Sequence, residues 1–392
     1  MVCVTDPAWA VGIGIGVGHS TEPTVSGASG RMGPRAIRAK DILLDTSPAR
    51  QVLTLWKNAP RHGSSGGRAG AARIAKTPAY RTTRAFMKQL ACTGTEAEIA
   101  RAIELPDSGL CGFGMDPAYQ SQKSIDAMVR ELDARKAALG KRIAARVGRY
   151  LPEGRRWRTT TVWFVIASQG MFDAVTLDAH TFDRDYRGQS VEPDPDLPKE
   201  PVVLVNLTEV LSYGSTTKER IDELEHVLAH EMFHAAMKNL EPELPGWSEA
   251  AQSSTQDPDV AYIARVMLDE GIAHYVDWRD RAGADTLFAW KPSANERRAF
   301  ERLASALDRI RGAVTRGERV ETVQLAGHGP LWSKYGAISG MFAAYRIEMA
   351  RGLAGVREAV AAGPNEFLRT YREVAAHNPA LMRISSELIV TQ

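Results

Sequence analysis

Apolar residues recur along the chain with two different periods. Helical spacing predicts helices in the part before Pro152 and again from Thr216 almost to the C-terminus. Between these parts, segments 159–168, 173–182 and 201–211 are rich in β-branched and aromatic residues and are bounded by Pro, Gly and Asp, which is typical of strands. The pattern therefore predicts a predominantly helical α+β fold with a small mixed or antiparallel sheet.

Four helices are expected before Pro152. The first begins near Ser47, a plausible cap, with Pro48 in its first turn, and runs to about Trp56. Further helices are predicted over 78–90, 96–105 and 117–151, the last broken near Gly140. The Gly- and Arg-rich segment 61–73 is expected to be a loop.

Three regions are expected along the chain. Residues 1–40 carry many Gly, Ser, Thr and Pro without a sustained period, which favours a disordered leader. A helical region over 41–151 and a second region over 152–392 follow, and a single continuous domain over 41–392 remains an alternative. The run GIGIGVG at 12–18 lacks the preceding strand and following helix that a dinucleotide-binding turn needs, so no nucleotide site is predicted there.

Composition narrows the class of protein. With 44% hydrophobic and 24% charged residues among 392, the chain has an ordinary globular composition, and no window of eighteen apolar residues predicts a membrane span. The first residues make a poor secretory signal, so the cytoplasm is the default expectation, with secretion open if the start site is misassigned. For Cys92 and Cys111, a disulfide and free thiols both stay open.

Charge is unevenly distributed although the net charge is only +2. Thirteen Lys or Arg residues between positions 31 and 88 face only Asp41 and Asp45. Such a segment can contact nucleic acid or another anionic surface. Because no interleaved aromatic residues and no nucleic-acid-binding motif accompany it, a solvated basic face is expected and no nucleic-acid partner is predicted.

The stretch LAHEMFHAAM at 228–237 places costly polar groups in an otherwise apolar helix. Thr216 and Glu219 form a capping box at its start, and the helix is expected to run to about residue 239. His230 and His234 project from one face, one turn apart, at the separation at which two imidazoles share one metal ion. Glu231 is displaced around the helix, where it can reach a water molecule bound to that metal.

This arrangement is the HExxH pattern of zinc hydrolases, in which zinc takes three protein ligands and keeps a fourth position for water. The alternative is structural: two core histidines bonded to their neighbours, with Glu231 in an ion pair.

A third ligand is predicted on a second long helix. Asp257 and Pro258 open this helix, which is expected to run to about Asp280. Glu270 stands mid-helix and is followed by Gly271, which lets another helix come close, so Glu270 is the predicted third ligand. Asp269 is adjacent, is expected to face elsewhere and is the weaker candidate.

HEMFH, followed 36 positions after its second histidine by Glu270 in EGIAHY, resembles the gluzincin metallopeptidases. It is more similar to a bacterial family of proposed zinc-dependent peptidases that pair HExxH with an EGxAxY segment, and the likeness extends over about 201–371. The resemblance implies a zincin-like catalytic region over 152–392, one Zn²⁺ per chain, and His230, His234 and Glu270 as its ligands. It also implies a glutamate ligand carried by a helix later in the chain.

The chain departs from thermolysin-like members of the group at one position. Those members carry an aspartate one turn after the ligand glutamate, where it orients a ligand histidine. Here that position is His274, and Asp277 lies a turn beyond. Either Asp277 takes the orienting role or the surroundings of the metal are built differently.

The expected reaction is amide hydrolysis with Glu231 as general base. Tyr335, His274 and His328 are candidates for stabilising the oxyanion, and Tyr335 is favoured because it opens a helix whose Gly336 and Gly340 permit close packing. Ordinary structural roles stay open for Tyr335 and His274.

Three functions remain on the sequence alone. A metallopeptidase acting on a peptide or protein is expected. A metal-dependent hydrolase of a non-peptide amide or ester would use the same residues, and a non-enzymatic binding protein would use the basic N-terminal part. Strand 201–211 is expected to be either a core strand or an edge to which an extended peptide pairs.

Overall fold

A computed structural model describes residues 38–58, 65–89, 92, 94–108, 115–154, 157–179, 194–247, 257–312 and 314–389. The expected leader, apart from its last three residues, and the glycine run at 12–18 lie outside the described residues. So do Cys3 and Cys111. Cys92 is disulfide-bonded, which decides between the two alternatives left open for this residue. In the part of the chain described here, no helix has both the length and the apolar character needed to cross a bilayer.

Four strands form one mixed sheet in the order β1-β2-β4-β3. They are β1 (Ile42–Asp45), β2 (Thr160–Val165), β3 (Ala174–Leu177) and β4 (Val202–Asn206). β1, β2 and β4 are parallel, and β3 runs antiparallel to β4 with Val175 opposite Leu204. The predicted α+β class with a small mixed sheet is confirmed.

β4 lies inside the sheet, between β2 and β3, and is buried along its whole length. The strand predicted over 201–211 is shorter than expected, because β4 ends at Asn206 and the helix α7 (Leu207–Val210) follows. Its strand part is an ordinary core strand, and the interpretation as a sheet edge is wrong. A strand that is buried on both faces has a continuous run of apolar residues, as in VVLV. Such a run does not alternate with polar residues, so it does not indicate where in the sheet the strand lies. Among the described strands, β3 and β1 form the two edges.

β1 was not predicted from the sequence, since its four residues are too few to give a clear period. It pairs in parallel with β2, Ile42 lying opposite Thr160, and thus brings the N-terminal region into the same sheet as the later strands. The division at residue 151 stays a prediction, and this pairing favours the alternative of one continuous domain over 41–392.

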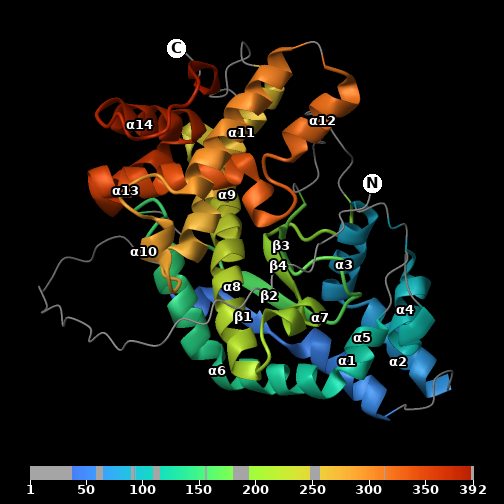
Figure 1. Cartoon of the computed structure of the whole chain (residues 1–392). Helices are drawn as coiled ribbons and strands as arrows, with labels where there is room; N and C mark the ends of the chain where they lie inside the picture. Colours follow the sequence, from blue (N-terminus) through green and yellow to red (C-terminus); the bar gives the residue numbers. More distant parts are fainter. Residues whose placement is uncertain are drawn as a thin grey trace, which may run out of the picture.

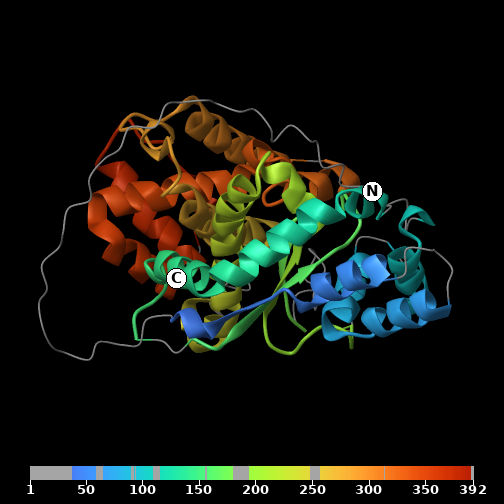
Figure 2. The same cartoon turned by 90° about the horizontal axis from the view of Figure 1, so that it is seen from below.

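Helices account for most of the remaining described residues. In Figures 1 and 2 the sheet and α8 lie in the middle, with α1–α4 on one side and α13 and α14 on the other. The N-terminal helices are α1 (Ser47–Asn58), α2 (Ser65–Ala75), α3 (Pro78–Gln89), α4 (Glu96–Glu104), α5 (Asp116–Gln120) and α6 (Gln122–Gly148). The later ones are α7 (Leu207–Val210), α8 (Thr217–Leu240), α9 (Pro258–Trp278), α10 (Ala284–Leu287), α11 (Ala294–Arg311), α12 (Arg316–Gln324), α13 (Tyr335–Ala362) and α14 (Pro364–Ala376). Short 3-10 turns lie at Ala39–Asp41, Pro106–Ser108, Leu211–Tyr213, Glu241–Glu243, Pro245–Trp247, Leu331–Ser333 and Ser386–Leu388.

Two expectations about glycines are wrong. Segment 61–73 was expected to be a loop, but most of it is helical, because α2 begins at Ser65. A Cβ at Gly70 would lie 2.5 Å from Cδ1 of Leu55 in α1. Tertiary packing of small residues against α1 thus outweighs their poor helix propensity. α6 likewise continues through Gly140, where the chain at Ala39 passes close to the helix, without the expected break.

The helices that carry the predicted ligands begin where the sequence indicates. Glu219 N–H donates to Thr216 Oγ1 (3.2 Å) and Thr216 N–H donates to the Glu219 carboxylate (3.0 Å), which completes the predicted capping box of α8. Asp257 caps α9 by accepting a hydrogen bond from Asp259 N–H (2.9 Å), and Pro258 occupies the first helical position. Both starts are confirmed.

α9 and α13 cross with their backbones in contact. A Cβ added at Gly271 would lie 2.6 Å from Cα of Gly340, and one added at Gly340 would lie 1.8 Å from the carbonyl oxygen of Met267. The inference that Gly271 allows another helix to come close is confirmed, and the predicted close packing of Gly340 is confirmed as well. This crossing fixes the stretch of α9 next to Glu270.

Candidate metal centre

His230 and His234 stand on one face of α8 with their rings turned toward each other. Their Nε2 atoms are 3.2 Å apart, and the ring centroids are 4.8 Å apart. Zinc–nitrogen bonds of about 2.0–2.1 Å in a tetrahedral site put two ligand atoms about 3.3 Å apart. The two imidazoles therefore already have the separation that one zinc ion requires.

Glu270 approaches this pair from α9. Its Oε1 lies 3.4 Å from Nε2 of His234, and its Oε2 lies 3.7 Å from Nε2 of His230. Its side chain is 29% exposed, compared with 12% for His230 and 10% for His234, so the cluster opens to solvent on the Glu270 side. The structure brings the three predicted ligands together and supports their assignment.

A second combination exists in the same place. Potential ligand atoms of His230, Glu270 and His274 all lie within 4.8 Å of one another. Two atoms bound to one zinc ion can be no more than about 4.1 Å apart, twice the bond length, so this wider set fits less well than the one with His234. His274 accordingly flanks the predicted site rather than replacing a ligand in it.

Each of the two predicted ligand imidazoles has a further polar contact that holds its ring in place. Oδ1 of Asp269 lies 3.0 Å from Nδ1 of His234, and a ring N–H of His230 donates to the main-chain carbonyl of Ala273. Such contacts fix the tautomer and the direction of a metal-binding imidazole. The expectation that Asp269 faces elsewhere is wrong.

The predicted alternative for this role, Asp277, lies elsewhere. Its carboxylate pairs with Arg281 (2.7 Å) and lies 3.5 Å from Nδ1 of His226, one turn before His230 on α8. The contact that orients the predicted ligand His234 thus comes from Asp269, which the sequence analysis weighed only as a ligand.

Burial and neighbouring charges set the protonation of the two histidines. Burial, followed by the charges of His274 and His234, holds the pKa of His230 well below its ordinary value. Burial works to lower the pKa of His234 as well, but Asp269 and Glu270 raise it to about 10. Without a metal ion, His230 is therefore neutral and His234 protonated near neutral pH, and a metal that binds Nε2 of His234 has to displace its proton.

Glu231 points from α8 toward the edge strand β3. Oγ1 of Thr176 lies 2.8 Å from Oε2 of Glu231 and also 2.8 Å from its main-chain oxygen. Burial raises the pKa of the Glu231 carboxyl to about 7, although His234 and Thr176 oppose this. A carboxylate that exchanges its proton near neutral pH suits a general base.

His274 is buried beside His230, with 4.5 Å between the ring centroids, and its Nε2 lies 3.9 Å from Oε2 of Glu270. Neither of its ring nitrogens has a hydrogen-bond partner among the described residues. Burial and the charge of Lys334 hold its pKa well below the ordinary value, so the ring is neutral and keeps one N–H to donate. Lys334 acts on His230 in the same direction, and the sequence analysis did not single it out.

The other two oxyanion candidates differ from His274. Tyr335 is buried at the start of α13, and its hydroxyl donates to the carbonyl of Thr322 (2.9 Å). His328 is mostly exposed, and its Nδ1 lies 3.1 Å from the carbonyl of Gln324. None of the contacts found in the described part of the chain joins Tyr335 or His328 to the histidine cluster.

Comparison with known protein families gives a match to this region. The model of the family described as "Putative zinc dependent peptidase (DUF5700)" matches residues 86–380, which include the whole cluster and the helices that carry it. No curated protein and no solved structure matches the chain.

Proposed function

The chain belongs to this family, since the match covers more than half of its length, and we propose that it is a zinc metallopeptidase of the gluzincin type. The observation that carries the proposal is the convergence of His230, His234 and Glu270. The two histidine Nε2 atoms lie 3.2 Å apart, and each has one carboxylate oxygen of Glu270 within 3.7 Å, close to the spacing that a single tetrahedral zinc ion imposes.

When bound there, zinc would act as a Lewis acid on a substrate carbonyl and lower the pKa of a water molecule. Glu231 takes a proton from the attacking water and delivers it to the leaving amine nitrogen as the carbon–nitrogen bond breaks. Thr176 holds the Glu231 carboxylate in place for both transfers.

Of the three predicted oxyanion candidates we favour His274, also over Tyr335. The neutral imidazole of His274 has an unused N–H beside His230 and Glu270, whereas the Tyr335 hydroxyl is engaged by Thr322. A buried donor without a partner is costly, and an oxyanion formed during the reaction would satisfy it. The positive charge of Lys334 acts on both His230 and His274.

The substrate we propose is a peptide or protein in extended conformation. β3 is an edge strand among the described strands, and its Thr176 touches the general base Glu231. A peptide that pairs with the outer edge of β3, the edge away from β4, would pass close to Glu231.

Metal analysis of the purified protein beside Glu270→Ala tests the ligand set. We expect one equivalent of zinc in the native protein and a sharp loss in the variant. Glu231→Gln should keep the zinc and lose most turnover in a peptide-library digest. Hydrolysis of amide or ester substrates with no cleavage of any peptide would instead identify a non-peptide hydrolase.

A further inference from the structure

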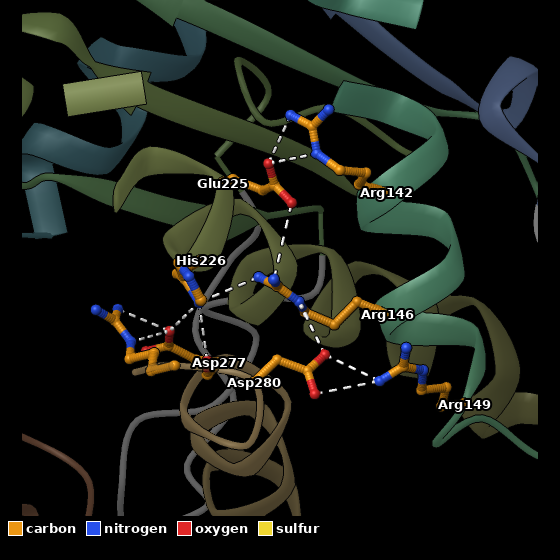
Figure 3. Close-up of polar contacts among 8 residues, drawn as sticks. Arg142, Arg146, Arg149, Glu225, His226, Asp277 and Asp280 are labelled. Atoms are coloured by element: carbon orange, nitrogen blue, oxygen red, sulfur yellow. Dashed lines mark hydrogen bonds and ion pairs between the residues drawn. The ribbon is translucent and has the colours of Figure 1, made fainter. Parts of the chain in front are cut away.

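Three arginines on one face of α6 lie against the helices that carry the ligands (Figure 3). Arg142, Arg146 and Arg149 are spaced by four and three residues, which places them in one row along α6. α6 lies outside the cluster itself and supplies none of the predicted ligands. The role of these three guanidinium groups is therefore not to bind the metal.

The two outer arginines each hold a single helix. Arg142 pairs with Glu225 on α8 through Nε (2.8 Å) and Nη2 (2.7 Å). Arg149 donates to both carboxylate oxygens of Asp280, just beyond the end of α9, at 2.9 and 3.2 Å. Both arginine side chains are about half exposed (47% and 50%), and solvated pairs of this kind contribute little to stability.

Arg146 contacts both helices at once. Its Nη2 lies 3.7 Å from Glu225 and its Nη1 3.1 Å from Nδ1 of His226, both on α8, while its Nε lies 3.6 Å from Asp280. Its side chain is only 14% exposed. Ionic contacts that are shielded from water act more strongly than solvated ones, so Arg146 is the effective member of the row.

The contacts of Arg146 extend to the interface between α8 and α9, which is called the seam below and includes His226, Asp277 and Arg281. His226 lies one turn before His230 on the same face of α8. The same Nδ1 that lies near Arg146 donates its N–H to the main-chain oxygen of Asp277 (3.0 Å), which lies two turns after Glu270 on α9, so the contact with Arg146 is one of packing and charge and not a second hydrogen bond. Arg281 closes the end of this seam by pairing with both Asp277 (2.7 Å) and Glu223 of α8 (2.6 Å).

We propose that Arg146 is a positioning residue that sets the register between α8 and α9, and through it the distance from Glu270 to His230 and His234. Ligand atoms bound to one zinc ion must lie within about 4.1 Å of each other, so a slide of one helix by about 1 Å would carry Glu270 out of the set. The link to zinc rests on the proposed function, whereas the link between the helices does not.

A series within the row tests the inference, because Arg142→Ala removes a contact to α8 alone and Arg149→Ala removes one to the end of α9 alone. Zinc affinity is measured by competition with a chromophoric chelator, and the metal environment by the visible spectrum of the Co²⁺ form. We expect Arg146→Ala to weaken zinc binding by about tenfold or more and to alter the spectrum. Arg142→Ala and Arg149→Ala should stay within about twofold of the native protein, and Arg146→Lys should recover part of the loss.

An Arg146→Ala protein with native zinc affinity and an unchanged Co²⁺ spectrum would overturn the proposal. So would equal losses of affinity in all three alanine variants, since that result indicates general destabilisation. If Arg146→Ala does not fold, Asp280→Asn removes its partner at the end of α9, and the same loss of affinity is expected.

Hydrogen exchange of the metal-free protein separates this inference from the proposed function. Arg146→Ala should speed exchange in both α8 and α9 near the seam, Arg142→Ala in α8 only, and Arg149→Ala at the end of α9 only. If the native protein binds no zinc, the proposed function fails, and the exchange pattern still decides whether Arg146 joins the helices. Exchange that rises in one helix only for Arg146→Ala would contradict it.

Discussion

Asp269 and Glu270, neighbours on α9, act on opposite ends of the same imidazole. Oδ1 of Asp269 lies 3.0 Å from Nδ1 of His234, and Oε1 of Glu270 lies 3.4 Å from its Nε2. Successive residues point about 100° apart around a helix, so both can reach one ring that lies across the helix surface. The ring is thereby fixed with Nε2 turned toward His230.

Asp269→Asn removes the charge behind His234 while keeping the size of the side chain. We expect zinc affinity to fall by about 10- to 100-fold, as for other groups that orient a ligand histidine. Chelator competition measures the change. Asp259→Asn, on the same helix but paired with Arg319 near its start, serves as the matched control and should leave zinc affinity as it is.

Gly340→Ala should disturb both the fold and the centre. The added methyl would lie 1.8 Å from the carbonyl oxygen of Met267, so α13 must move away from α9 beside Glu270. Overpacking of this kind costs about 1–3 kcal/mol, and we expect a lower free energy of unfolding in urea together with weaker zinc binding.

The control for Gly340 is Gly317→Ala in α12, where an added Cβ would meet nothing within 4 Å. It should be neutral or stabilise the protein by about 0.5–1 kcal/mol, because alanine is the better helix former. Equal losses in both variants would show that the crossing with α9 does not account for the effect.

Much of the candidate centre follows from local patterns in the sequence. The spacing of His230 and His234, the capping box at Thr216 and the cap at Asp257 are all short-range features that a helix fixes by itself. Glu270 was predicted from its place in the middle of a second helix and from Gly271 beside it, and the resemblance to known peptidases supported the choice. No periodicity relates residues on two different helices.

The features that were missed depend on contacts between distant segments. β1 has only four residues and is defined by its partner β2, and α2 is a helix of small residues that depends on α1. The role of Asp269 could not be predicted from the sequence, because tertiary packing sets the direction of the His234 ring. Adjacent acidic residues on a predicted ligand helix are the signal that could have indicated it.

Replacing His274 or Tyr335 with phenylalanine tests which of these two residues stabilises the oxyanion. His274→Phe keeps a ring of similar size but removes the unused N–H beside Glu270, and kcat should fall by about 10²- to 10³-fold with zinc content retained. Tyr335→Phe removes a hydroxyl bonded to Thr322 and should change kcat by less than about threefold. The opposite pattern in peptide hydrolysis would assign the oxyanion to Tyr335.

The carboxyl of Glu231 should make the stability of the metal-free protein depend on pH. Burial raises its pKa from 4.5 to about 7 in the folded protein, while the unfolded chain keeps the ordinary value. The folded state thus binds this proton more tightly. Its stabilising contribution is complete below the unfolded pKa and is lost as the pH rises through about 7.

Glu231→Gln removes this titration, so the variant should gain stability relative to the native protein as the pH rises from 5 to 8. A shift of this size corresponds to about 3 kcal/mol, and because Glu231 is only half-buried, screening by solvent reduces the expected gain to about 2 kcal/mol. Urea unfolding of both proteins in the presence of a chelator, at pH 5 and at pH 8, measures it. A difference between the two proteins that stays the same at both pH values would mean that Glu231 keeps its ordinary pKa, and a general base tuned to neutral pH would then lose its support.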